Sequence, residues 1–357
     1  MAARSRTSCR HSMPIVPASP DALHIGARVV VRYRLEPAET AATPGRPTMT
    51  DAVGDLVRRD DDVLVVETRR GRVSVRCDWV VAVKEVPPAP ARRAPAHLAL
   101  SVPDMARVSA PSWGAVERET LGAWELRASH GFTQRGSSAL VLGDPGLPLP
   151  AALDAVERWY AVRGLPPRVA LPGSTGFDPG SDPVGAALLA RGWTAGGRSH
   201  HLTAATATIA TADPWSPDGP RVDVTEELLD PWLEAYRRSR TVVESAVPAV
   251  LGGSPRQLFG SIAADDAPPQ HPPVAIARLA VAHGWAGLGA VWTDPDHRGR
   301  GLARRLTARL AAVAAADGIR LVHLQVEADN APALRLYEGI GFERHSEYVY
   351  LTGPTRS

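Results

Sequence analysis

The sequence predicts an α+β protein in which a small all-β barrel precedes two related units of strands and helices. Short β-branched runs without helical spacing follow the N-terminal tail. A strongly amphipathic helix follows a strand hairpin near the C-terminus. The helix-to-strand segment Leu188–Trp193 aligns with Tyr337–Phe342, and Leu202-Thr203 aligns with Leu351-Thr352 at the same spacing. This repeat predicts two units of similar fold.

The bulk properties narrow the class of protein. A chain of 357 residues is too long for one compact core. A net charge of +2 makes a dedicated nucleic-acid binder unlikely. The two cysteines, Cys9 and Cys77, form neither a disulfide framework nor a metal-ligand pattern, so we expect no metal. No membrane span and no secretion signal are present, which predicts a cytoplasmic protein with no membrane partner; Met13 is an alternative start.

The N-terminal third is predicted to be a tail, a barrel and a linker. We expect residues 1–20 to be disordered and residues 21–86 to form an SH3-like β-barrel, since alternating runs such as Arg28–Leu35 recur without a helix. The pair Arg70-Gly71 marks a hairpin between two of these runs. Residues 87–110 then read as a linker rich in proline and arginine.

The barrel is poor in aromatic residues, with only Tyr33 and Trp79. Stacking on bases or prolines needs such rings, so nucleic acid is an unlikely partner. We therefore expect the barrel to dock a protein partner or the chain's own remaining units.

Strands and helices alternate in two units, residues 111–212 and residues 213–357. In the first unit, Leu149–Gly164 and the stretch from Val184 have helical spacing, and strands are expected near residues 169–173 and 200–206. The second unit is expected to contain a hairpin at His283-Gly284-Trp285. Helices are expected at residues 301–318 and 331–339, and each is followed by a strand, at residues 320–328 and 346–351 respectively.

A glycine- and arginine-rich turn, Asp296–Leu306, precedes the strongest helix. A helix N-terminus presents unpaired N–H groups and partial positive charge, and glycines let an anion approach the backbone. Arg298, Arg300 and Arg304 add charge. The order of residues is neither a Walker loop nor a dinucleotide fingerprint. The turn therefore predicts a site for the phosphates of a cofactor.

Two motifs in order resemble the GCN5-related N-acetyltransferase (GNAT) superfamily. The first, Arg298-Gly299-Arg300-Gly301-Leu302-Ala303, matches the acetyl-CoA loop after a strand that ends in Asp-Pro. The second runs from Asn330 through Ala333, Leu336 and Tyr337 to Gly341-Phe342. The resemblance spans Val274 to Leu351 and implies tandem GNAT-like units with a mixed, mostly antiparallel sheet flanked by helices.

The resemblance also implies roles for individual residues. Backbone amides of the loop would hold the pyrophosphate of acetyl-CoA, the strand would pair with its pantetheine arm, and Asn330 would bond that arm. Tyr337 would act as general acid toward the departing thiolate. The cofactor-binding residues implied are Val291, Trp292, Thr293, Arg298, Gly299, Arg300, Gly301, Leu302, Ala303, Asn330, Ala333 and Tyr337.

The general base has several candidates. His323, Gln325 and Glu327 share one face of the strand at residues 320–328. Gln325 occupies the position at which ribosomal-protein Nα-acetyltransferases have a glutamate base, so His323 and Glu327 are the nearest alternatives. Glu244, His283 and a water molecule are further options.

The whole chain resembles an actinobacterial family of barrel plus tandem GNAT units, some members of which carry the name N-acetylglutamate synthase. That implies N-acetylation of a small amino acid, as in arginine biosynthesis, with Arg237, Arg238 or Arg240 holding carboxylates. Mycothiol synthase-like activity, acetylation of proteins or peptides, and non-catalytic sensing of acetyl-CoA remain alternatives. The first unit has Gly146-Leu-Pro-Leu-Pro in place of the glycine loop, so we expect it to bind no second CoA.

Overall fold

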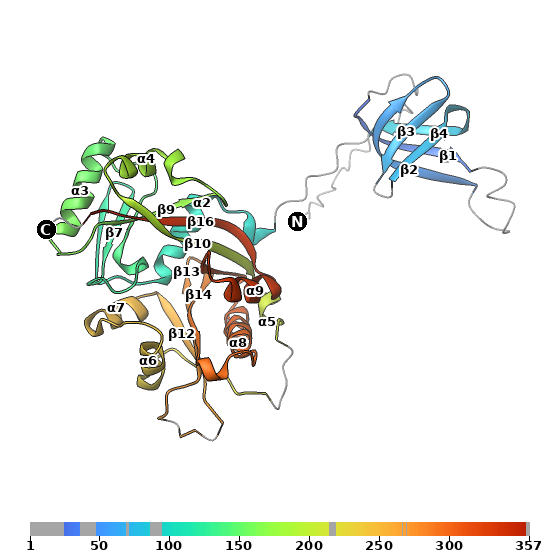
Figure 1. The fold of residues 1–357 in the computed structure, drawn as a ribbon. Helices are drawn as coiled ribbons and strands as arrows, with labels where there is room; N and C mark the ends of the chain where they lie inside the picture. The colour runs from blue at the N-terminus through green and yellow to red at the C-terminus, as the bar shows by residue number, and fades with distance from the viewer. Residues whose placement is uncertain are drawn as a thin grey trace, which may run out of the picture. The chain divides into compact units, whose positions relative to one another are not determined.

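The computed structural model describes residues 25–35, 48–68, 71–85, 95–213, 219–265, 267–268 and 270–354. Two compact units are present, Met1–Arg93 and Ala94–Ser357 (Figure 1). The predicted tail, Arg70 of the predicted hairpin, residues 87–94 of the predicted linker, and residues 266 and 269 lie outside the described residues.

The N-terminal unit is a five-stranded antiparallel sheet in the order β4-β3-β2-β1-β5. Alternate residues of its strands, among them Val29, Val31, Leu56 and Leu64, are fully buried in one core. The all-β prediction is therefore confirmed. The strands are β1 (Arg28–Arg34), β2 (Met49–Arg59), β3 (Val63–Thr68), β4 (Gly71–Arg76) and β5 (Val80–Glu85), with a 3-10 turn η2 (Cys77–Trp79).

The C-terminal unit is built on one eleven-stranded sheet flanked by helices (Figure 1). Its strands are β6 (Glu117–Leu121), β7 (Trp124–Ala128), β8 (Ala139–Leu140), β9 (Arg168–Gly173), β10 (Thr194–Ala205), β11 (Asp223–Thr225), β12 (Arg256–Ile262), β13 (Ala275–Ala282), β14 (Trp285–Thr293), β15 (Leu321–Glu327) and β16 (Glu343–Thr352). Its helices are α2 (Val102–Ser109), α3 (Leu149–Ala161), α4 (Pro183–Ala190), α5 (Thr206–Ala210), α6 (Asp230–Arg237), α7 (Val247–Leu251), α8 (Leu302–Ala316) and α9 (Ala331–Gly339).

The two halves of this sheet exchange their last strands. The order is β11-β12-β13-β14-β15-β10-β16-β9-β8-β7-β6, so β10 pairs with β15 of the second half and β16 pairs with β9 of the first. Each half also contains one parallel pair, β8 with β9 and β14 with β15. The tandem arrangement predicted from the repeat is confirmed, and one sheet crosses the expected boundary at residue 212.

Helix α2 lies inside the stretch expected to be a linker. In the C-terminal unit the described residues begin at Pro95, and Ser101 caps the helix by accepting a hydrogen bond from the Asp104 N–H at 3.3 Å. Ala106 of this helix packs in one cluster with Leu140, Leu142 and Ala170, and Leu140 of β8 pairs with Ala170 of β9. The predicted linker is thus shorter in the structure, because its C-terminal part covers the first half of the sheet.

Helix α8 packs Leu306 and Leu310 onto the sheet, and both are fully buried. The expected hairpin between β13 and β14 is confirmed: His283 and Gly284 both have positive φ, at 50° and 75°, as a tight two-residue turn requires. Within the described part of the chain, no helix combines the length and apolarity needed to cross a membrane.

Candidate active site

Strands β14 and β15 part midway and open a cleft. They pair in parallel from Trp285 opposite Leu321 to Leu288 opposite Leu324, and β14 continues beyond this pairing. Its register with β13 shifts at the same level, and Ala290 has φ 51°, an uncommon value for a residue with a side chain. The bulge turns the backbone of β14 away from β15, so the edge after Leu288 is free to pair with an extended ligand.

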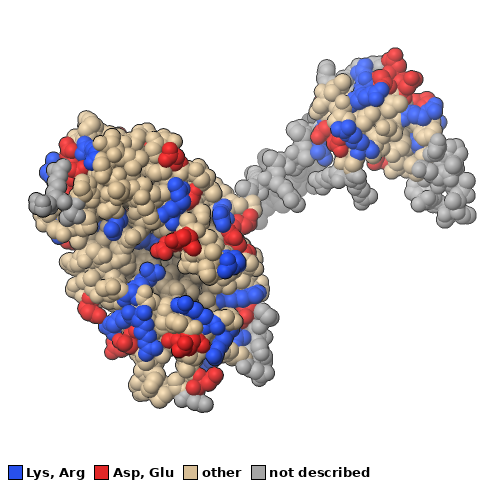
Figure 2. Space-filling view, viewed as in Figure 1, with Lys and Arg blue, Asp and Glu red and all other residues tan. Residues whose placement is uncertain are grey.

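A cavity of about 580 Å³ lies at this cleft. The second half contributes Gly289, Ala290 and Val291 of β14, the end of β15, and Asn330, Ala333 and Tyr337. The first half contributes Trp113, residues 131–135 and Arg168, and β16 adds Tyr348 and Tyr350. Figure 2 shows this unit hollowed on one face, with basic side chains at the rim and acidic ones beside them. Trp292 and Thr293 follow on β14 but are not part of the cavity wall.

The glycine turn has the geometry of an anion site. Gly299 and Gly301 both have φ 76°, and apart from the adjoining residues no heavy atom lies within 4 Å of the position a Cβ would take. Gly301 is the N-cap of α8 and has no side chain to cap the helix. Because the first backbone bond of this helix runs from the Arg305 N–H to the Gly301 oxygen at 3.0 Å, the preceding amides lack helical partners. These residues fit a pyrophosphate.

The arginine side chains of this turn are not equally available to contact an anion. Nε of Arg298 donates to the Thr293 oxygen at 3.3 Å, and Arg300 donates to the Asp296 oxygen at 3.4 Å, while both residues stay exposed. Nε of Arg304 donates to the Ala212 oxygen at 2.7 Å. Arg304 therefore holds the chain next to α5, and Arg298 and Arg300 are the better sources of free charge.

Asn330 and Tyr337 both line the cavity. Oδ1 of Asn330 accepts from the Ala333 N–H at 3.2 Å and caps α9, which leaves its amide hydrogens for a ligand. Tyr337 is 6% exposed, and none of the described residues bonds to its hydroxyl. Burial raises the pKa of Tyr337 well above its usual range, so the hydroxyl is protonated at neutral pH.

Of the candidates for the base, Glu327 lines the cavity. His323 does not, although it lies on the same face of β15. His323 is 3% exposed, with Nε2 3.2 Å from Oγ of Ser112 and Nδ1 3.3 Å from Nε2 of His201. Burial lowers the pKa of His323 to about 3. His323 is therefore not part of the cavity wall, because the segment around Ser112 covers this part of the strand.

Apart from Arg240, the remaining candidates lie outside the cavity. Arg237 donates to both carboxylate oxygens of Glu244 at 2.9 Å, and this pairing lowers the pKa of the glutamate. His283 is exposed in the hairpin turn. Arg238 is 3.8 Å from Asp294. Among the three arginines expected to hold carboxylates, Arg240 is the one in the cavity wall.

The contribution of the first half to the cavity wall was not predicted from the sequence. A Cβ on Gly287 would lie 2.2 Å from Oγ of Ser112, and one on Gly289 would lie 2.9 Å from the Trp113 ring. Both glycines therefore let the segment Ala110–Trp113 pack directly on β14. Glycines inside a predicted strand are a signal of such close approach, which the pattern Ala286-Gly-Leu-Gly-Ala290 carries.

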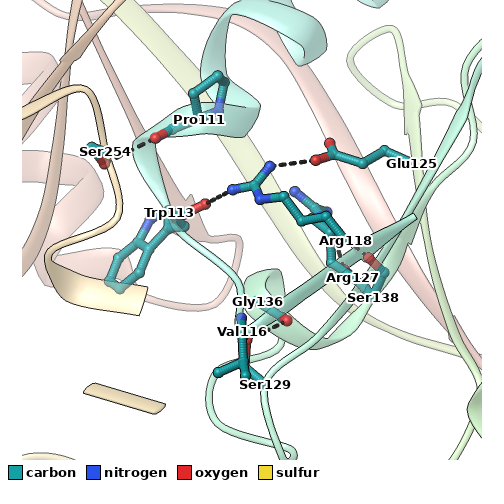
Figure 3. A network of polar contacts seen from close by, with 10 residues as sticks. All are labelled: Pro111, Trp113, Val116, Arg118, Glu125, Arg127, Ser129, Gly136, Ser138 and Ser254. Atoms are coloured by element: carbon teal, nitrogen blue, oxygen red, sulfur yellow. Dashed lines mark hydrogen bonds and ion pairs between the residues drawn. The ribbon is translucent and has the colours of Figure 1, made fainter. Parts of the chain in front are cut away.

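Polar contacts fix this segment in place (Figure 3). Oγ of Ser254 donates to the Pro111 oxygen at 2.9 Å, and Arg118 donates to the Trp113 oxygen at 3.1 Å. The buried guanidinium of Arg278 donates to the oxygens of Leu251 and Ser112, both at 2.6 Å. The position of Trp113 in the cavity wall is thus set by both halves of the unit.

A family model described as "Probable histone acetyltransferase Rv0428c C-terminal" matches residues 102–351, which is most of the chain. The chain belongs to this family. A model described as "Rv0428c N-terminal Sm-like domain" matches residues 23–84, so the barrel is of the Sm-like type, similar to an SH3-like barrel.

Three known proteins are similar to this chain. The "Probable histone acetyltransferase Rv0428c" of Mycobacterium tuberculosis is 30% identical over 334 residues, covering 92% of this chain and 95% of that protein. A "Mycothiol acetyltransferase" of Kocuria rhizophila is 47% identical over 62 residues, which is 17% of this chain and 20% of that protein. A "GCN5-related N-acetyltransferase from Kribbella flavida" has a TM-score of 0.49 at 20% identity, over 71% of this chain and 95% of that chain.

The protein is a GNAT-type acetyltransferase with tandem units and an N-terminal Sm-like domain. GNAT acetyltransferases use acetyl-CoA, and the glycine turn, the free edge of β14 and the cavity fit that cosubstrate. No group of residues suited to a metal ion occurs among the described residues.

Proposed function

We propose that the protein acetylates the primary amine of a small amino acid, with glutamate as the favoured acceptor. The observation that carries the proposal is one cavity that joins the free edge of β14, Tyr337 and Glu327 to a wall with three arginines that form no ion pair with a described residue. The cavity thus offers a donor for the leaving group, a base for the amine and positive charge for carboxylates.

In this proposal bound acetyl-CoA supplies an activated acyl group. Glu327 takes a proton from the acceptor ammonium, directly or through water, so that the nitrogen lone pair can attack the thioester carbon. As the carbon–sulfur bond breaks, Tyr337 gives its hydroxyl proton to the sulfur, and the second proton that the nitrogen loses restores the Tyr337 hydroxyl, directly or through water. Backbone amides of residues 298–303 hold the pyrophosphate, and the amide of Asn330 orients the cosubstrate arm.

Three other functions compete with this one. A relative is named for histone acetylation and others for mycothiol acetylation, and a sensor would bind acetyl-CoA without turnover. The cavity wall carries Arg135, Arg168 and Arg240 against one carboxylate, Glu327, among its described residues. Excess positive charge repels a lysine-rich tail, which favours an acceptor that bears carboxylates.

A panel of amines assayed for CoA release by the full-length protein tests the proposal. The panel contains glutamate and other amino acids, the amine precursor of mycothiol and a basic histone-tail peptide. We expect release with amino acids and little with the peptide. Faster release with the peptide would contradict the substrate class, and acetyl-CoA binding without release on any amine would favour a sensor.

We further propose that the reaction takes place in the cytoplasm and that the barrel docks a protein partner or the chain's own acetyltransferase units. The barrel has only two aromatic residues in its sequence, Tyr33 and Trp79. The guanidinium of Arg76 lies 5.3 Å from the centre of the Trp79 ring and covers it, which supports docking over base stacking.

A further inference from the structure

We infer that Arg135, from the half without a glycine loop, binds the carboxylate of the acceptor and so sets the specificity of the enzyme. The inference rests on the proposed function, because it names the residue that selects the amine. It assigns a role in substrate recognition to the half of the sheet that lacks the CoA motifs.

Arg135 lies where two cavities meet. It lines the 580 Å³ cavity of the active site and an adjoining cavity of about 40 Å³. Nε of Arg135 donates to the Tyr348 hydroxyl at 3.1 Å. Its guanidinium carbon lies 5.7 Å from the centre of the Trp113 ring and 5.9 Å from that of Tyr348. The aromatic rings hold the guanidinium in place and leave its terminal nitrogens for a ligand.

No carboxylate of the described residues forms an ion pair with Arg135. Other arginines of the same half have such partners: Arg163 is 2.9 Å from Glu117, and Arg198 is 3.2 Å from Glu347. A half-buried guanidinium without a counter-ion is costly unless an anion binds there. Its fork of N–H groups matches a carboxylate, which it binds through two parallel hydrogen bonds.

The backbone before Arg135 is strained. Thr133 has φ 57° and lines the cavity, and His130 has φ 51°. Positive φ is a rare conformation for a β-branched residue, and such strain concentrates at functional sites. Oγ1 of Thr133 accepts from the Gly136 N–H at 3.0 Å. Oγ of Ser129 donates to the Gly136 oxygen at 2.8 Å (Figure 3). The loop is therefore a fixed platform for the arginine.

The proposed base lies within electrostatic reach of this group. Burial lowers the pKa of Arg135, but attraction by Tyr348, Tyr350 and Glu327 outweighs burial, and the pKa ends above its ordinary value. The guanidinium is therefore charged at neutral pH. A base and a carboxylate-binding group in one cavity suit an acceptor that carries both an amine and a carboxylate, as an α-amino acid does.

The test compares acceptors that differ only in charge. L-glutamate, its side-chain amide L-glutamine and its α-amide L-isoglutamine are assayed with the full-length protein and the variants Arg135→Gln and Arg135→Lys. Arg163→Gln is the matched control, because it removes an arginine of the same half that does not line either cavity.

We expect the wild type to prefer glutamate to one monoamide by at least about tenfold, since a hydrogen bond to a charged group contributes that much. Arg135→Gln should raise KM for glutamate by about 10- to 100-fold and abolish the preference, with acetyl-CoA affinity unchanged. Arg135→Lys should be intermediate, because it keeps the charge but loses the fork. The control should behave like the wild type.

Several outcomes would overturn the inference. If Arg135→Gln and Arg135→Lys keep the wild-type preference, or weaken acetyl-CoA binding instead, Arg135 does not bind the acceptor carboxylate. If the wild type acetylates glutamate and both amides equally well, acetyl transfer stands and the carboxylate site is refuted. If no amine is acetylated, the proposed function and the inference both fail. Thermal unfolding of each variant separates these results from misfolding.

Discussion

Lowering the pH should destabilise the C-terminal unit through its buried histidines. His323 is held between Ser112 and His201 in the core of the sheet, where burial lowers its pKa from 6.5 to about 3. Burial also lowers the pKa of His201 well below its ordinary value, with repulsion by His323 adding to the effect. The fold requires both rings to be neutral.

The size of the effect follows from proton linkage. The unfolded chain binds a proton at His323 below pH 6.5, while the folded chain does so only near pH 3. Stability is therefore fully present above pH 6.5 and is lost as the pH falls toward 3, by up to about 1.4 kcal/mol per pH unit. Between pH 8 and pH 5 this one residue lowers the free energy of unfolding by about 2 kcal/mol.

The assay is urea unfolding of the wild type and of His323→Gln at pH 8, 6.5 and 5, followed by tryptophan fluorescence. Of the nine tryptophans only Trp79 lies in the barrel, so the signal reports mainly on the C-terminal unit. We expect the variant to be less stable than the wild type at pH 8. Between pH 8 and pH 5, however, its free energy of unfolding should fall by about 2 kcal/mol less than that of the wild type. His271→Gln, at an exposed site, is the control. Parallel losses in the wild type and His323→Gln would refute the reasoning.

Two predictions concern the cosubstrate. Gly301→Glu should abolish acetyl-CoA binding in calorimetry because it places a carboxylate where the pyrophosphate binds, whereas Gly318→Glu, at another left-handed glycine beyond the far end of α8, should not. The same titration should give one CoA per chain, since Pro148 and Pro150 remove amides at the start of α3; two sites would contradict this. Tyr337→Phe should lower the single-turnover rate toward the lower end of about 10²- to 10⁴-fold, with acetyl-CoA affinity and stability retained. An unchanged rate would mean that Tyr337 only packs.

Local features of this protein could be predicted from the sequence. The apolar stripe of α8, the hairpin at His283-Gly284 and the glycine-rich turn before α8 depend on residues close in the chain, so spacing and glycine placement were enough. The motif residues Asn330 and Tyr337 were likewise predicted, and both line the cavity.

The tertiary structure decided which strands pair and what covers each face. Alternation along β15 places His323 and Glu327 on one face, but only packing shows that one is buried under Ser112 and the other lines the cavity. The exchange of β10 and β16 and the approach of Arg135 to the cleft join residues far apart in the chain. Periodicity carries no information about such partners, because strand pairing and burial depend on the whole folded chain.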